Sequence, residues 1–400
     1  MKLFYGCLIG TIFISHLFCE VLNIEKLSAL IIQGNSTLSA SQKNIDVQTA
    51  KLHQSRTFSN PELEIESELG EDAESTGMIT QNIMLGGKRK HNIQIHELEL
   101  GLSRLEYENL KTKILNESNH VFVEILHLQA QKLLQHDRIT SSEELLAVVK
   151  KKVLAGKLSP AEKSRAKINL IQEESTLRKI DISLQISWKT LSAFWEDDTS
   201  PYDIAVGTFY SMNKIPSILS VENSPEILIS KLSIEIQNAK IKIEKSNAFP
   251  NIQLGAGLKR SELLGNTFQV GLSIPIPIFN RNRGNINSLI SEFEQIQHTS
   301  TALKFKLETD VSNHNTKLEE LAYEINILNR EIIPEANSAH TIINDGYLNG
   351  RFTYLDVMDA KEMWFSSKSQ YLNALKEYHI HFITLNHILG NTNHNFLKEN

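Results

Sequence analysis

The chain has 400 residues, of which 41% are hydrophobic and 22% are charged, and its formal net charge is −6. A chain of this length can hold two or three domains, and its composition is that of a folded protein. Acidic and basic residues are interspersed without a basic block, so the sequence excludes a nucleic-acid groove and nucleic acid as a partner.

The first 19 residues have the form of a secretory signal peptide. Lys2 precedes a mostly apolar run that ends at Phe18, and polar sequence begins at Glu20. This run is too short and too polar for a membrane-spanning helix, which needs about 20 apolar residues. The only cysteines, Cys7 and Cys19, lie within these 19 residues, so we expect the mature chain to have neither an intrachain disulfide framework nor a thiolate metal site.

The next stretch combines helix with a β-hairpin. Residues 24–58 predict one or two amphipathic helices with a break near Gly34, because apolar residues recur three and four positions apart. Residues 60–87 predict a hairpin. Its first arm alternates between mostly apolar residues on one face and four carboxylates on the other, Glu62, Glu64, Glu66 and Glu68.

Residues 88–155 predict one unusually long helix. They contain no proline and a single glycine, and an unbroken helix of this length would reach about 100 Å. A turn follows near residues 156–160, where Ser159 and Pro160 begin a second helix that runs to about Trp195. Interleaved apolar and charged positions indicate that these helices pack side by side in a bundle or coiled coil.

The second half repeats this order after residues 197–224, which contain two prolines and are interpreted as a linker or a small mixed equatorial segment. Its predicted elements are a helix at 225–248, a hairpin at 249–279, a helix from 285 to about 346 with a kink at Pro334, a turn at 347–353, a helix at 353–389 and a disordered tail at 391–400. Residues 269–278 alternate as a strand with one apolar face, and Pro275 and Pro277 indicate that the sheet ends there.

An internal alignment indicates duplication. Residues 156–167 align without gaps on residues 350–361, and the two segments share a glycine, a Ser or Thr and an Ala-Lys pair at equal spacing. The chain is therefore interpreted as two tandem repeats, 20–196 and 225–390, offset by about 190 residues. We expect a mainly α protein in which each repeat combines long helices with one β-hairpin.

Four strands with one apolar face are too few to close into a barrel. Open strand edges cannot lie in hydrocarbon, where each unsatisfied backbone group costs several kcal/mol. The smallest bacterial outer membrane barrels have about eight strands. A membrane-embedded form must therefore be an oligomer, with eight strands from two copies or twelve from three.

Several motifs resemble one known family: NPEL at 60–63, LGGKR at 85–89, FPN at 249–251, GLSIPIPIFNRNRGNI at 271–286 and the stretch 347–390. Over about residues 24–390 the chain is similar to the TolC-type outer membrane efflux proteins, and most similar to their CzcC-type heavy-metal branch. The resemblance implies a homotrimer, with a 12-stranded transmembrane β-barrel in outer membrane lipid and an α-helical barrel crossing the periplasm. Family members are often lipidated on a cysteine such as Cys19, whereas Phe18 is bulkier than the small residue that this processing prefers.

The resemblance also implies a role for the two turns. A periplasmic adaptor would dock at these tips, on Gly156, Leu158, Ser159, Gly350, Phe352 and Thr353. Nearby, four residues match the family pattern for a closing aperture: Tyr347, Gly350, Asp356 and Asp359. In the family the aspartates form rings that constrict the pore and select cations, and the tyrosine takes part in the closing network. Phe352 occupies the place of the family's closing arginine and Arg351 is adjacent, so the sequence departs from the family's closing salt bridge. The alternative is that both aspartates are solvated charges on a helix face.

Two further groups have competing interpretations. The four glutamates of the first hairpin would line the barrel lumen, either enriching cations or forming the wet side of a porin-like strand. The histidines near the C-terminus are interpreted as ordinary surface residues rather than a metal site, because residues two apart do not share a helix face: His379, His381, His387 and His394. No nucleophile motif or metal-ligand cluster stands out, so we expect no enzyme, no cofactor and no bound metal.

Together these features predict a passive export duct. By resemblance to the branch, its substrates would be divalent heavy-metal cations, handed over by an inner-membrane pump of the RND type and its periplasmic adaptor. Two alternatives stay open. One is a non-conducting periplasmic adaptor or scaffold of helical hairpins, and the other is the same duct serving drugs or protein secretion.

Overall fold

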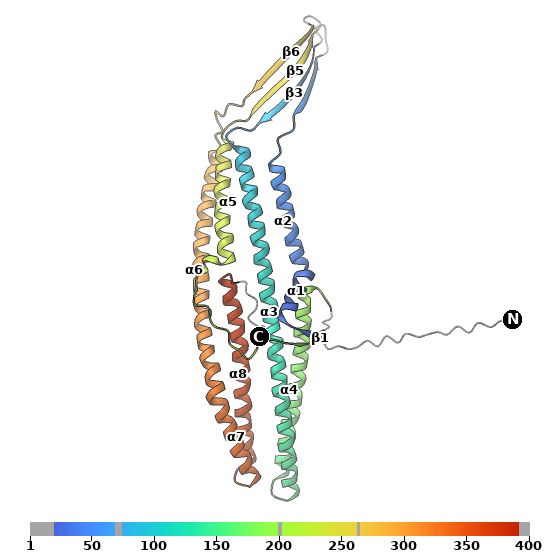
Figure 1. Cartoon of the computed structure of the whole chain (residues 1–400), viewed down its shortest axis with the longest axis vertical. Coiled ribbons are helices and arrows are strands. Elements are labelled where there is room, and N and C mark those ends of the chain that lie inside the picture. The colour runs from blue at the N-terminus through green and yellow to red at the C-terminus, as the bar shows by residue number, and fades with distance from the viewer. Residues whose placement is uncertain (1–19, 69–73, 199–201, 262–264, 392–400) are drawn as a thin grey trace, which may run out of the picture.

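A computed structural model describes residues 20–68, 74–198, 202–261 and 265–391. The predicted signal peptide with Cys19, and the predicted tail from residue 392, lie outside the described residues. The molecule is a long rod in which the helices run along one axis and a small sheet extends from one end (Figure 1). The two helix-to-helix turns lie together at the opposite end.

Two similar series of elements follow one another. The first comprises β1 (Glu20–Leu22), α1 (Ile24–Gly34), α2 (Ser36–Ser55), β2 (Glu62–Glu68), β3 (Glu74–Ile83), α3 (Lys88–Leu154), α4 (Pro160–Ser192) and η1 (Ala193–Trp195). The second comprises α5 (Pro225–Asn247), β5 (Ile252–Ser261), β6 (Gly265–Ser273), α6 (Arg283–Ile327), η3 (Leu328–Ile332), α7 (Ile333–Leu348) and α8 (Tyr354–Ile388). Between them lie β4 (Tyr202–Ala205) and η2 (Val221–Asn223).

α3 is a single helix of 67 residues, as its lack of breakers predicts. It starts where Gly86 and Gly87 adopt positive φ angles of 69° and 76°, a conformation that favours glycine and turns the chain from strand into helix. At Pro334, where a kink is predicted, α6 passes into α7 through the π-helical segment η3, because proline has no N–H for the preceding turn. No described helix has a run of residues long and apolar enough to cross a membrane.

The two hairpins form one antiparallel sheet with the strand order β2-β3-β5-β6. β3 pairs with β5 across the two hairpins, which leaves β2 and β6 as the edges. Successive side chains of a strand point to opposite faces, so the register gathers large apolar side chains on one face. These are between 44% and 75% exposed: Leu63, Ile65, Ile79, Leu254, Leu258, Phe268, Val270 and Leu272.

The opposite face of the sheet is polar and contains closely approaching glycines. A Cβ added at Gly257 would lie 2.2 Å from the carbonyl oxygen of Gly77, so β3 and β5 approach each other only because residue 257 is glycine. β6 ends at Ser273. The predicted strand to residue 278 is therefore wrong beyond this point, because Pro275 and Pro277 cannot donate ladder hydrogen bonds.

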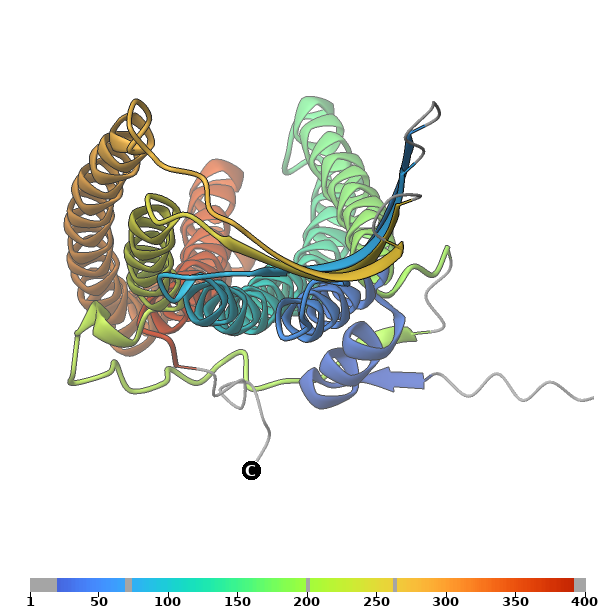
Figure 2. The ribbon, with the colours of Figure 1, turned by 90° about the horizontal axis from the view of Figure 1, so that it is seen from above.

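Residues 202–224 form a belt along one side of the helices (Figure 2). β4 of this belt pairs in parallel with β1. Phe209 is only 3% exposed, and its ring lies 6.3 Å from that of His127 on α3 and 5.8 Å from that of His379 on α8. The main hydrophobic core surrounds this point and joins α1, α3, α6 and α8. The belt is thus packed into the core, more firmly than a plain linker would be.

Candidate functional site

The two tips have the same backbone construction. Each ends a helix with a glycine in the left-handed conformation, Gly156 with φ 70° and Gly350 with φ 78°. In each, the glycine N–H and the next N–H bond back to the last helical turn, which is the Schellman motif. The bonds are Gly156 N to Val153 O (3.0 Å), Lys157 N to Lys152 O (2.8 Å), Gly350 N to Tyr347 O (3.1 Å) and Arg351 N to Gly346 O (2.7 Å).

The helices that leave the tips start with side-chain caps. The hydroxyl of Ser159 accepts a hydrogen bond from Ala161 N at 3.2 Å. At α8, the Asp356 carboxylate accepts from Thr353 N at 2.7 Å and the Thr353 hydroxyl accepts from Asp356 N at 3.3 Å, which is a capping box. Hydrogen bonds from the Thr353 backbone and then its hydroxyl hold the pKa of Asp356 below its ordinary value. Asp356 therefore has a local structural role, whatever its role in a pore.

A cleft of about 490 Å³, the tip cleft, lies between the two tips. It brings together five residues that the sequence singled out: Leu158, Tyr347, Gly350, Phe352 and Thr353. The remaining lining residues are Lys152, Lys157, Glu162, Leu348, Asn349 and Tyr354. The other predicted tip and aperture residues do not line it: Gly156, Ser159, Arg351, Asp356 and Asp359.

Lys152 joins the two tips, and sequence reasoning gave it no role. Its ammonium group donates to the carbonyl oxygen of Tyr347 and lies 3.7 Å from the centre of the Tyr347 ring. Burial, and then the charge of Lys157, lowers the pKa of Lys152. In the sequence Lys152 follows Lys150 and Lys151, and no feature distinguishes it from these neighbours.

Tyr347 is a buried residue that lines the tip cleft. It is only 2% exposed and packs in a small core formed by α3, α4, α7 and α8. Its hydroxyl is buried without a hydrogen-bond partner among the described residues. Burial, and then the charge of Glu162, raises the pKa of Tyr347, so the phenol stays neutral at physiological pH.

Phe352 and Arg351 differ in their surroundings. Phe352 packs its ring on Gly346, where an added Cβ would lie 2.3 Å from the ring. The side chain of Arg351 is exposed and has no ion-pair partner in the described part of the chain. At the position where the resemblance implies a closing arginine, this chain has Phe352, whose ring packs on Gly346.

The carboxylates predicted to form pore rings and those predicted to line the barrel lumen lie at opposite ends of the rod. Asp359 is exposed on α8, one turn after Asp356, and no described side chain pairs with it. At the other end all residues of β2 are exposed, and four carboxylates share the polar face of the sheet: Glu62, Glu64, Glu66 and Glu68. Pore rings require several copies, so their roles remain predictions.

The interpretation of the C-terminal histidines as ordinary surface residues is wrong for three of them, and His394 lies outside the described residues. His387 is partly buried, and burial lowers its pKa. His379 is 0% exposed and bonds to the Phe209 carbonyl oxygen at 2.8 Å, and burial lowers its pKa. His381 is partly buried and faces His314 of α6. Both partners are distant in sequence, so periodicity alone could not reveal them. No three metal-ligating side chains converge within the described ranges.

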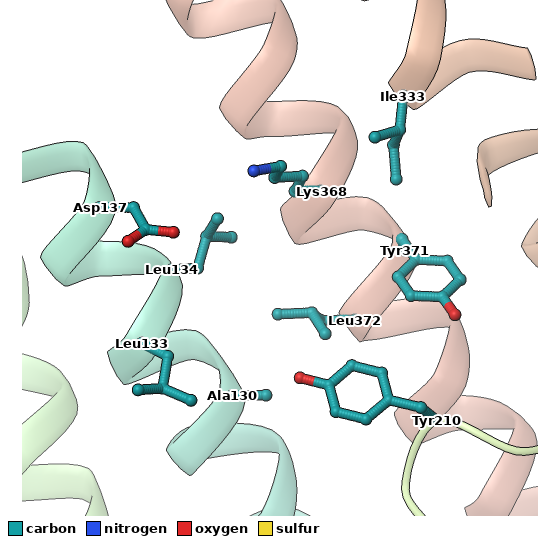
Figure 3. Close-up of a pocket in the computed structure, with 9 residues that line it drawn as sticks. All are labelled: Ala130, Leu133, Leu134, Asp137, Tyr210, Ile333, Lys368, Tyr371 and Leu372. Atoms are coloured by element: carbon teal, nitrogen blue, oxygen red, sulfur yellow. The ribbon is translucent and has the colours of Figure 1, made fainter. Parts of the chain in front are cut away.

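A pocket of about 300 Å³ lies between α3 and α8, where the belt crosses them (Figure 3). Its lining is mainly aliphatic and aromatic: Ala130, Leu133, Leu134, Tyr210, Ile333, Tyr371 and Leu372. Asp137 on α3 and Lys368 on α8 complete the lining. The Lys368 ammonium lies 3.9 Å from the centre of the Trp364 ring, so this cation already has a partner. The pocket marks the place where the belt meets the helix pair.

Comparison with known proteins gives consistent results. The family model described as outer membrane efflux protein matches residues 27–195 and 219–391. The cobalt-zinc-cadmium resistance protein CzcC of Cupriavidus metallidurans is 27% identical over 376 residues, which cover 92% of this chain and 90% of CzcC. The motif resemblance drawn from the sequence is thereby confirmed.

Solved structures share the fold at low sequence identity. The CusC structure has a TM-score of 0.80 and 16% identity, with 92% of both chains covered. VceC from Vibrio cholerae has a TM-score of 0.78 and 16% identity, with 92% of this chain and 96% of VceC covered. Because the family model matches both halves, we conclude that this chain belongs to the outer membrane efflux protein family.

Proposed function

We propose that three copies of this chain form a passive export duct through the outer membrane and the periplasm. The observation that carries the proposal is the four-stranded sheet with an exposed apolar face and two open edges. Pairing β6 of one copy with β2 of the next would remove every edge and give a closed barrel of twelve strands. The apolar face would then contact lipid, and the glutamate face would line the lumen.

The tips are proposed as the end that receives substrate. Exposed apolar residues there suit contact with a periplasmic adaptor: Leu154 is 89%, Leu355 59% and Leu348 50% exposed. Threefold symmetry would bring Asp356 and Asp359 from each copy around one axis, where rings of carboxylates favour cations. An inner-membrane pump of the RND type would supply the energy for export, because the proposed duct is passive.

We propose divalent heavy-metal cations as the substrate. The name of the CzcC relative, a cobalt-zinc-cadmium resistance protein, supports this class. The four lumen-facing glutamates per chain also favour cations over anions. A strain lacking the gene should lose tolerance to cobalt, zinc or cadmium and regain it on complementation. Unchanged metal tolerance with new sensitivity to drugs would instead assign the duct to organic solutes.

Conductance of the purified oligomer in a planar bilayer tests the duct itself. We expect cation-selective currents, with selectivity reduced in the double variant Asp356→Asn with Asp359→Asn. Asp46→Asn, an exposed change on α2, is the matched control and should behave as the wild type. Recovery of the protein as a soluble periplasmic monomer would contradict the duct and favour a helical-hairpin scaffold.

A further inference from the structure

Two imidazoles from different helices face each other in the middle of the rod. The Nδ1 atoms of His314 on α6 and His381 on α8 are 2.8 Å apart, and both side chains are partly buried. Their ring centres are 5.0 Å apart and their planes are inclined by 57°. α6 and α8 run side by side here (Figure 1), so the two nitrogens belong to a contact that joins two helices.

The contact between the rings contains a lone pair that can bind a metal ion. At 2.8 Å only one of the two Nδ1 atoms can carry a hydrogen, so the other presents a lone pair. Burial lowers the pKa of His314, and burial followed by the charge of His314 lowers the pKa of His381. Neutral imidazoles are the commonest metal ligands in proteins. A metal ion can take the place of this hydrogen if the donor ring moves its proton from Nδ1 to Nε2, so that both Nδ1 atoms present lone pairs and no net proton is released.

The hydrogen between the nitrogens lies near the line that joins them, so both rings must turn before their lone pairs can converge on an ion beside that line. An ion about 2.0–2.1 Å from both Nδ1 atoms would subtend an angle of about 85° between them, close to the right angle of square-planar and octahedral sites. A tetrahedral ion would need the nitrogens about 3.3 Å apart. We propose that His314 and His381 form a chelating site for a tetragonal or octahedral transition-metal ion, Cu²⁺ or Ni²⁺ in preference to Zn²⁺.

The surroundings of the pair can balance the charge of such an ion. Asp310 lies one turn before His314 on α6, and its charge raises the pKa of that ring. Glu377 lies one turn before His381 on α8 and has the same effect there, together with Glu320, while Lys317 opposes it. Since no third ligating side chain converges among the described residues, water would complete the coordination shell.

The other histidines of this region have different partners. His379 bonds to the Phe209 carbonyl oxygen. His120 of α3 lies 3.4 Å from the Thr384 hydroxyl. Burial, and then the charges of His387 and His381, lowers the pKa of His120. The proposed site is therefore the His314–His381 pair alone, with one ion per chain.

Titration calorimetry of the purified full-length oligomer with Cu²⁺, Ni²⁺ and Zn²⁺ tests the site. We expect one Cu²⁺ or Ni²⁺ per chain, bound more tightly than Zn²⁺. His314→Gln and His381→Gln should each weaken binding by about tenfold or more, because one of two nitrogen ligands is lost. His298→Gln, an exposed histidine on the same helix, is the matched control and should leave binding unchanged.

A second measurement uses the wild-type protein, so its result does not depend on whether a variant folds. The electron paramagnetic resonance spectrum of the Cu²⁺-loaded wild type should show hyperfine coupling to two nitrogens, and Ni²⁺ should raise the melting temperature more than Mg²⁺ does. Coupling to one nitrogen or none, or binding that persists in the double variant, would overturn the proposal. The binding assays need no conduction, so their outcome is separate from that of the proposed duct.

Discussion

The two ends of the rod differ in how much of their structure one chain completes. At the tip end, both turns are closed by Schellman glycines, both helices that follow are capped, and Lys152 joins the two halves. At the sheet end, large apolar side chains are exposed and two strand edges have no partner within the chain. The difference teaches that one chain completes the tips but leaves the apolar face and the edge strands of the sheet uncovered.

The largest expected effect comes from breaking the sheet at Gly257. In Gly257→Val the new Cβ would meet the backbone of Gly77 at 2.2 Å, and backbone cannot yield as a flexible side chain does. We expect loss of the oligomer and of membrane recovery, while helical content measured by circular dichroism stays near that of the wild type. Gly77→Ala is the matched control, because nothing lies within 4 Å of a Cβ there. A Gly257→Val protein that still assembles would show that the sheet tolerates separation of β3 and β5.

The next effect concerns Lys361, which ties α8 to α3 above the tip core. It is 3% exposed, donates to the Arg138 carbonyl oxygen at 3.2 Å and bonds to the Ser142 hydroxyl. Burial lowers the pKa of Lys361 from 10.5 to about 8. The unfolded state therefore holds this proton more tightly, and the free energy of unfolding should rise by up to about 3 kcal/mol between pH 8 and 10.5.

Chemical denaturation across this pH range measures the effect. Lys361→Met should be more stable than the wild type at pH 7, because it buries no charge, and should lack the rise above pH 8. Lys163→Met, an exposed change on α4, should keep the wild-type profile. Identical profiles for the wild type and Lys361→Met would contradict a buried, titrating Lys361. Assembly should be unaffected, which separates this variant from Gly257→Val.

A smaller effect is expected at the joint between the tips. Lys152→Met removes the hydrogen bond to the Tyr347 carbonyl and the cation–π contact, at a cost of about 0.5–2 kcal/mol. We expect faster hydrogen exchange at residues 345–350 and a larger single-channel conductance. Lys151→Met, on the exposed side of the same turn, is the control. Equal exchange in both variants would mean that Lys152 does not hold the tips together.

The smallest effect separates the two aspartates. Asp356→Ala removes the capping box with Thr353 and should lower the melting temperature, whereas Asp359→Ala, with no described partner, should leave it unchanged. Thermal denaturation of both variants beside the wild type checks this. If Asp359→Ala alone changes ion selectivity and Asp356→Ala alone changes stability, only Asp359 acts as a pore charge.

Much of the fold could be predicted because its breaks are marked by particular residues. Gly156 and Gly350 take positive φ angles that other residues avoid, and Ser159 and Thr353 cap the helices that follow. Alternation over residues 269–278 identified the last strand but not its end. The alternating pattern continues past Ser273, where the strand ends, into a proline-containing segment without strand hydrogen bonds.

The contacts of Lys152 and His381 depend on how the helices pack, which the sequence pattern does not determine. Lys152 lies in a run of three lysines, and only the packing of α3 against α7 selects it for Tyr347. His381 meets His314 because α6 and α8 lie in one particular axial register. With apolar and charged positions mixed along these helices, several registers are equally compatible with the pattern, so neither contact could be predicted.

The pairing of β3 with β5 has a consequence for the order of folding. The hydrogen bond between Gln253 and Thr80 spans 173 residues of sequence, whereas α3 and α4 are joined by a short turn. As the chain is made, α3 and α4 can pack long before β5 exists to receive β3, because local contacts form first. Until β5 is made, the strands of the first hairpin lack their partner and expose apolar side chains to water. During that interval aggregation competes with assembly.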